Sequence, residues 1–322
     1  MKDKFLKALE DKDFSELFKK GGISLFLRIG GQVMGFLMSF VVAHYFGAKG
    51  LGNYVLAIVV LRIFTLVSKL GLDTFSIRFI ASFAKQGKWK SIQLFRKKII
   101  TIVSITSLIS SVVMFIFSFE IANLVNTRVE YIELSSFFVL PMVFFMLHYQ
   151  SLRGLKRIAE FSFFYRMSQA TFSIAGLFLI SQFIQSDKIP IYAYLTSLCT
   201  VSLLSYVSYY YWFNKKCNFA GDGRHHPTTF ERKDEYGFVI YGSYEEQEEV
   251  EDIEDLPLKQ MLKISLPLMF AQSVQFIMAW TDKLMLGNML GPESVAIYGV
   301  AFRFSMGVSI TLMAINSIAS PK

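Results

Sequence analysis

The feature that most constrains the fold of this chain is a series of apolar runs, each about 20 residues long, the length of helix that crosses a bilayer. Hydrophobic residues make up 53% of the 322 residues, and 33 residues are Phe. A soluble domain has no use for so much apolar surface. We therefore predict an all-α integral membrane protein, a multi-span helical bundle. Its eight predicted spans are residues 23–46, 54–72, 99–119, 134–151, 161–183, 190–213, 264–287 and 295–317.

The basic residues predict the orientation of these spans. Segments 1–22, 73–98, 152–160 and 214–260 together hold 22 Lys and Arg residues, whereas the alternate segments hold three. Positively charged loops stay in the cytoplasm, so we expect a cytoplasmic N-terminus and a multi-pass protein of the cytoplasmic (inner) membrane. The formal charge of +8 is thus mainly a topology signal. We expect no nucleic-acid partner, because no basic patch lies on a recognisable soluble domain.

One short phrase occurs twice, at residues 46–57 and again at residues 290–301. In each copy a Gly (Gly47, Gly291) begins a turn, and a Tyr seven positions later (Tyr54, Tyr298) opens the next apolar run. The repeated unit is predicted to be a helix–turn–helix pair in the membrane. Equal orientation of the copies predicts a parallel repeat. A duplicated helical bundle is how many secondary transporters are built.

The repeat also predicts the domain organisation. An amphipathic cytoplasmic segment occupies residues 1–22, and the first six-helix lobe occupies residues 23–213. Residues 214–260 form a charged cytoplasmic linker, in which eight of the twelve residues 244–255 are acidic. Such a run repels itself, although a docking site for a partner is an alternative. Residues 261–322 hold the first two helices of a second lobe, so about four spans of a full duplication are missing, as in a fragment or a truncated product.

Charged groups inside spans are costly and usually face a protein-lined or water-filled interior. Arg28, Arg62, Arg166 and Arg303 are the candidates for a cationic, substrate-binding cavity, and they suit an anionic substrate because guanidinium stays charged and grips phosphate through a fork of donors. Asp282 is the candidate ion-coupling residue, as the only carboxylate expected well inside a span. Gln32, Gln169, Gln272 and Gln275 add hydrogen-bonding groups.

Less specific interpretations of these residues remain open. Lys69 and Arg166 could extend their charges to the cytoplasmic headgroups. Asp282 could form a structural ion pair with an Arg of a neighbouring span instead of coupling an ion. His225 and His226 lack further ligands at a useful spacing, so we expect no metal site and no catalytic residues.

Four stretches resemble one known family. These are residues 46–54, residues 71–81 (GLDTFSIRFIA), residues 152–157 (LRGLKR) and residues 282–287 (DKLMLG), the last leading into the second copy of the repeat. In their order along the chain they resemble the bacterial polysaccharide transporters, the O-antigen and exopolysaccharide flippases. That family belongs to the superfamily of multidrug/oligosaccharidyl-lipid/polysaccharide flippases. The resemblance covers the chain from about residue 20 to its end, apart from the acidic linker.

The resemblance implies a MATE-like fold with a complete first lobe and a partial second lobe, and alternating access. It implies that the cargo is an undecaprenyl-diphosphate-linked oligosaccharide and that membrane lipids and polysaccharide-assembly proteins are partners. It implies no cofactor, and H⁺ or Na⁺ is the candidate coupling ion. Three alternatives remain open: a drug or metabolite exporter, a non-transporting remnant, and a membrane-embedded glycan polymerase or ligase. Scarce intramembrane carboxylates disfavour the exporter, and short outer loops disfavour the enzyme.

Overall fold

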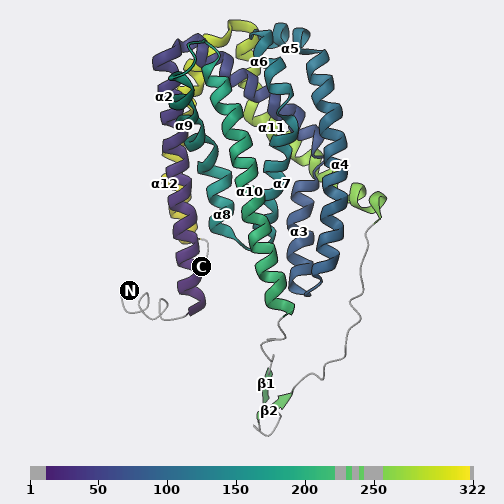
Figure 1. Cartoon of the computed structure of the whole chain (residues 1–322). Helices are drawn as coiled ribbons and strands as arrows, with labels where there is room; N and C mark the ends of the chain where they lie inside the picture. The colour runs from purple at the N-terminus through teal and green to yellow at the C-terminus, as the bar shows by residue number, and fades with distance from the viewer. Residues whose placement is uncertain (1–11, 222–229, 234–238, 243–256, 320–322) are drawn as a thin grey trace.

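The computed structural model shows an elongated bundle of helices (Figure 1). It describes the backbone of residues 12–221, 230–233, 239–242 and 257–319. An N-terminal bundle, α2 to α10, is followed by a C-terminal helix pair, α11 and α12. The helices of the N-terminal bundle are α2 (Lys12–Ser68), α3 (Leu72–Lys85), α4 (Trp89–Ile116), α5 (Ser118–Val125), α6 (Val129–Ser136), α7 (Val139–Gly154), α8 (Ile158–Ser162), the π-helix η1 (Phe163–Ser168), α9 (Gln169–Ser181) and α10 (Ile189–Gly221). The C-terminal pair is α11 (Leu258–Leu290) and α12 (Pro292–Ala319).

All eight predicted spans fall on helices, but their boundaries differ from the prediction. Among the described residues, four helices are long and apolar enough to cross a membrane, or five if the pair α6 and α7, bent by 54°, counts as one span. Helix α2 contains the first predicted span and most of the second, and the fifth is divided between α8, η1 and α9. The chain is an all-α integral membrane protein with several membrane-length helices.

The outer surface of the bundle is apolar, as expected of helices that face lipid rather than water. One face of α4 exposes aliphatic side chains over several turns, and α11 exposes large apolar residues along most of its length. A soluble protein rarely exposes apolar patches of this extent. The exposed residues on these two helices include Ile105, Leu108, Ile109, Val112, Ile116, Phe270, Val274, Ile277, Met278 and Met285.

The two copies of the repeat adopt the same turn. Gly47 bends α2 with φ 71° and ψ 176°, and Gly291 separates α11 from α12 with φ 83° and ψ 177°. Residues with a Cβ rarely adopt such positive φ values, so Gly is needed at both places. The helix–turn–helix unit predicted from the repeat is therefore present twice, and at the same position in each copy.

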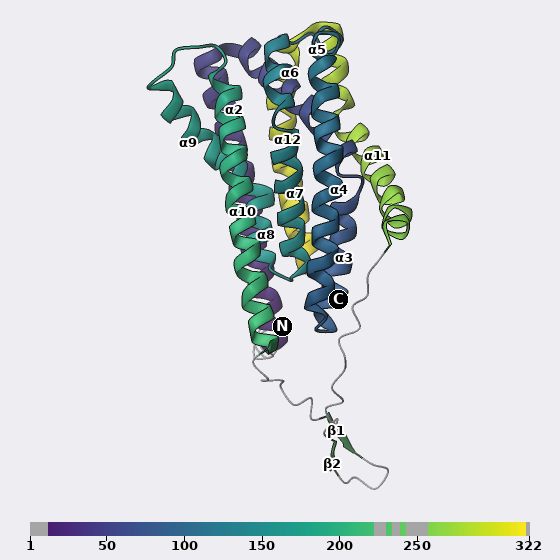
Figure 2. The same ribbon diagram turned by 45° about the vertical axis from the view of Figure 1, so that its right-hand side comes forward.

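The start of α12 packs against the part of α2 that follows the Gly47 turn, at one end of the bundle, which we call the turn end. A Cβ placed on Gly52 would overlap the carbonyl oxygen of Pro292, so the helices meet there at backbone distance. Asn288 Nδ2 donates a hydrogen bond to the carbonyl oxygen of Leu124 at 2.6 Å. The turn end thus joins the N-terminal bundle to the C-terminal pair. Helix α12 then continues alongside α2 away from this end (Figures 1 and 2).

The second predicted span ends differently from the prediction. Helix α2 stops at Ser68, Leu70 and Gly71 take positive φ values, and α3 begins at Leu72. Segment 73–98, counted above among the basic segments between spans, is mostly helical, because α3 covers residues 73–85 and α4 begins at Trp89. Helix α3 packs against α7 and α4. Apolar residues recur along α3 at a helical spacing (Phe75, Phe79 and Phe83) and are buried.

The predicted linker is partly structured in the described residues. Helix α10 runs on to Gly221, beyond the predicted boundary at residue 213. An antiparallel hairpin pairs β1 (Phe230–Lys233) with β2 (Val239–Gly242). The acidic run 244–255 lies outside the described residues. The predicted N-terminal segment 1–22 is described only from residue 12, where its backbone already belongs to α2.

The contact at the turn end predicts an asymmetric response to two Gly→Ala substitutions. Gly52→Ala inserts a methyl group against the backbone of Pro292, and overpacking of this kind costs roughly 1–3 kcal/mol. Gly299→Ala in α12 is the matched control, because no atom lies within 4 Å of its added Cβ. It should be neutral or stabilise the helix by up to about 1 kcal/mol. The free energy of unfolding of both variants is measured in mixed detergent micelles with increasing sodium dodecyl sulfate. Equal stability of the two variants would contradict the close contact between Gly52 and Pro292.

Candidate functional site

Three cationic side chains from different helices come together within the bundle, and we call them the cation layer: Arg62, Lys283 and Arg303. Arg62 lies on α2, Lys283 on α11 and Arg303 on α12. Both arginines lie within electrostatic range of Lys283, and Arg62 lies within range of Arg303. Arg62 is about 15 Å along its helix from Gly52, and Arg303 is about 16 Å along its helix from Pro292, at a rise of about 1.5 Å per residue. Arg62 and Arg303 therefore lie at similar depths below the turn end.

Two of these cations are held by aromatic rings. The Arg62 guanidinium lies 5.1 Å from the centroid of the Trp280 ring. The Lys283 ammonium lies 4.0 Å from the same indole and 5.0 Å from the ring of Phe302. A ring face attracts a cation through its quadrupole without neutralising its charge. Arg62 Nε is buried and has no hydrogen-bond partner, so this donor remains available.

Arg303 is held by the backbone of α2. Its Nη1 donates a hydrogen bond to the carbonyl oxygen of Gly35, and its own carbonyl oxygen accepts one from Gln32 Nε2 at 3.5 Å. A Cβ on Gly35 would come within 3.5 Å of the guanidinium, which shows how closely this residue fits. Among the described residues, no member of the cation layer forms an ion pair with a carboxylate.

The other two predicted arginines lie together at a different place. Arg166 lies on η1 with its guanidinium 4.5 Å from the ring of Tyr165, and it is within electrostatic range of Arg28. Tyr165 packs against Tyr149, whose ring centroid is 5.5 Å away. The four predicted arginines therefore form two pairs, Arg62 with Arg303 and Arg28 with Arg166. Tyr149 is within electrostatic range of both Arg62 and Arg166.

Asp282 does not pair with an arginine among the described residues. Its side chain is exposed and accepts a hydrogen bond from Tyr298 Oη at 2.6 Å. A second carboxylate, Asp73, is only 3% exposed, although it lies outside the helices that are long and apolar enough to cross a membrane. Asp73 was missed because the second span was taken to end at residue 72. A charged residue four positions after Lys69 was the available signal, since i,i+4 pairs meet on a helix face.

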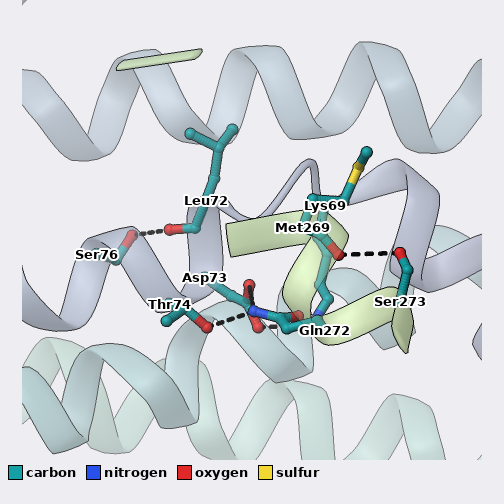
Figure 3. A network of polar contacts seen from close by, with 8 residues as sticks. All are labelled: Lys69, Leu72, Asp73, Thr74, Ser76, Met269, Gln272 and Ser273. Carbon is teal, nitrogen blue, oxygen red and sulfur yellow. Dashed lines mark hydrogen bonds and ion pairs between the residues drawn. The ribbon is translucent and has the colours of Figure 1, made fainter. Parts of the chain in front are cut away.

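Lys69 and Asp73 form a buried ion pair at the break between α2 and α3 (Figure 3). Lys69 Nζ lies 2.7 Å from Asp73 Oδ2, and Lys69 is 8% exposed. The interpretation that Lys69 extends to the headgroups was therefore wrong. Gln272 of α11 donates from Nε2 to Thr74 Oγ1 and, at 3.4 Å, to Asp73 Oδ1. This network of Lys69, Asp73, Thr74 and Gln272 is thus a second junction between the N-terminal bundle and the C-terminal pair.

The remaining predicted glutamines have separate roles. Gln169 donates from Nε2 to Ser197 Oγ at 2.8 Å and to the carbonyl oxygen of Tyr194, which fastens α9 to α10. Gln275 is exposed. Within the described part of the chain, no group of three His, Cys, Asp or Glu residues is arranged to hold a metal ion.

Comparison with protein families settles the class of this membrane protein. The family described as polysaccharide biosynthesis protein matches residues 17–321. The chain belongs to this family. The resemblance read from the four sequence stretches is thereby confirmed, and the chain is a multi-pass membrane protein of polysaccharide biosynthesis. Comparisons with curated proteins and with solved structures give no match.

The buried ion pair predicts strongly non-additive effects on stability. Lys69→Met should cost about 3–5 kcal/mol, because it leaves the Asp73 carboxylate buried without its cation. Asp73→Leu should be costly for the converse reason. The double substitution should be less destabilising than either single one, since no uncompensated charge remains. Denaturant unfolding in mixed micelles measures this double-mutant cycle, and additive effects would show that the two charges do not interact.

Proposed function

We propose that this protein is a flippase that moves an undecaprenyl-diphosphate-linked oligosaccharide across the cytoplasmic membrane to its outer leaflet. Membership of a polysaccharide biosynthesis family and several membrane-length helices support a membrane step of glycan assembly. The cargo of such a step has an apolar tail that can stay in the bilayer, and a diphosphate head that cannot cross lipid unaided. A transporter for it needs cations at membrane depth.

The cation layer is the observation that carries this proposal. Arg62 and Lys283 both lie close to the Trp280 ring, and Arg303 lies within electrostatic range of both. Because these cations rest on rings and on a backbone carbonyl, an arriving diphosphate need not displace a carboxylate from them. Charge-assisted hydrogen bonds to phosphate are about twice as strong as neutral ones, and the guanidinium fork can bind two phosphate oxygens at once.

The proposed cycle makes and breaks no covalent bond. The diphosphate head binds the cation layer from the cytoplasmic side, the two helix groups rock against each other, and the head leaves on the outer side. Arg28 and Arg166 form a second cationic position, near Tyr149 and Tyr165, that the head can contact on its way to or from the layer. The cytoplasmic N-terminus, the coupling ion and the two-lobe division remain parts of this proposal.

Removing one cation from the layer should weaken diphosphate binding without unfolding the protein. Arg62→Ala and Arg303→Ala should each reduce the affinity for undecaprenyl diphosphate about ten- to hundredfold, the loss expected for one charge-assisted hydrogen bond. In cells, each variant should abolish surface glycan while the protein stays in the membrane. Binding of the lipid to purified protein in nanodiscs, together with glycan staining of cells, measures both effects.

Arg128→Ala is the matched control for charge. Arg128 is an exposed arginine whose Nη2 pairs with Asp187 Oδ2 at 3.3 Å. Its partner is not a member of the cation layer. This variant should bind the lipid as the native protein does. Normal surface glycan in the Arg62→Ala, Arg303→Ala double variant would refute the cation layer as the cargo site.

A further inference from the structure

The cation layer lies between two junctions that join the N-terminal bundle to the C-terminal pair. Along α11, the residues follow in the order Gln272, Lys283 and Asn288. With a rise of about 1.5 Å per residue, Lys283 is about 16 Å from Gln272 and about 8 Å from Asn288 along the helix. Gln272 belongs to the Lys69–Asp73 network, and Asn288 belongs to the turn end. Helix α2 shows the same order, with Arg62 between Gly52 and Lys69.

The two junctions differ in their chemistry. The turn end is held by close backbone packing at Gly52 and Pro292 and by a hydrogen bond from Asn288. The other junction contains a buried ion pair that accepts a hydrogen bond from Gln272 across the interface. A Cβ on Gly71 would overlap the carbonyl oxygen of Ser265, so α11 also approaches the chain break closely here. Polar side chains in apolar surroundings have few alternative partners, so such contacts favour one defined arrangement.

We propose that the network of Lys69, Asp73, Thr74 and Gln272 is a gate that closes one side of the cation layer, and that the turn end closes the other. This inference rests on the proposed transport function. Both junctions are closed in this structure, and Lys283 of the layer is buried, whereas Arg62 and Arg303 are partly exposed. Separation of Gln272 from Asp73 opens one side while the turn end holds the two helix groups together.

The ion pair keeps the N-terminal side of this gate fixed. Lys69 stays with Asp73 when α11 moves away, because the pair spans the break between α2 and α3 within the N-terminal bundle. Leu70 and Gly71 both have positive φ, and this conformation is what places Asp73 one turn beyond Lys69 on a new helix. Gln272 is then the movable partner, and its buried Oε1 has no hydrogen-bond partner in the closed arrangement. The side chain of Gln272 is therefore held to the N-terminal bundle by hydrogen bonds from its Nε2 alone.

The test uses the reactivity of a cysteine within the layer and needs no cargo. Lys283→Cys is introduced after the two native cysteines are replaced (Cys199→Ser, Cys217→Ser). Lys283 is 8% exposed, so a cysteine there reacts with a membrane-impermeant thiol reagent only when one side opens. Labelling is measured in right-side-out and in inverted membrane vesicles.

Gln272→Leu should raise the labelling rate about tenfold in one vesicle orientation only, since loss of a hydrogen bond to a charged group shifts a two-state equilibrium by roughly that factor. Asn288→Ala, the matched change at the turn end, should raise the rate in the opposite orientation only. Gln272→Asn, which retains an amide, should have a smaller effect than Gln272→Leu.

An equal rise in both orientations, or no rise for Gln272→Leu, would overturn the gate. A failure of the cargo proposal is distinguished from this result, because the labelling is measured without lipid-linked glycan. Loss of diphosphate binding to the layer would leave the gate intact, and one-sided labelling by itself would not establish the cargo.

Discussion

The cost of placing a charge in apolar surroundings governs the arrangement of the polar residues in this protein. A bilayer offers no water to a buried ammonium or guanidinium group, so each must find a partner within the protein. The structure uses three kinds of partner. Lys69 forms an ion pair with the carboxylate of Asp73, and Arg303 donates a hydrogen bond to the backbone carbonyl of Gly35. Arg62 and Lys283 make cation–π contacts with the ring of Trp280. Lys69 meets its partner across a helix break, Arg62 and Arg303 meet theirs on another helix, and Lys283 also lies 5.0 Å from the ring of Phe302 on α12, so satisfying each charge also fixes how the helices pack.

The kind of partner separates charges that support the structure from charges that can bind a ligand. The Lys69–Asp73 pair is neutral as a whole, and each group already has its counter-charge. Arg62 and Lys283 rest on an indole, which attracts a cation but leaves its charge and its donors in place. The cation layer therefore keeps an excess of positive charge between two junctions, whereas the ion pair does not. This difference makes the first group suited to an anion and the second suited to holding helices together.

Much of the fold follows from periodicity and length, and the departures have identifiable physical causes. Every span predicted from an apolar run falls on a helix. The repeat predicted both glycine turns correctly, since only Gly tolerates the backbone conformation found at residues 47 and 291. Hydropathy did not detect the turn at Leu70 and Gly71, where the helix breaks without a change in apolar character, and so Asp73 was not recognised as a buried carboxylate. It also did not predict α3 as a helix, because the second span was taken to end at residue 72 and residues 73–98 were considered only for their basic charge. The pairing of Arg62 with Arg303 required three-dimensional packing, since these residues are far apart in sequence.

One backbone contact explains why Arg62 and Arg303 lie at similar depths. Gly52, in the part of α2 that follows the Gly47 turn, packs on Pro292 at the start of α12, and from this contact α2 and α12 descend into the bundle. Arg62 follows Gly52 by ten residues, and Arg303 follows Pro292 by eleven, so helices that start at one level carry their arginines to nearly the same depth. The contact between Gly52 and Pro292 thereby sets a common level for the two helices, although these two residues are not equivalent positions of the repeat. Arg62 and Arg303 lie at similar distances from this contact, and this is why they come within electrostatic range of each other.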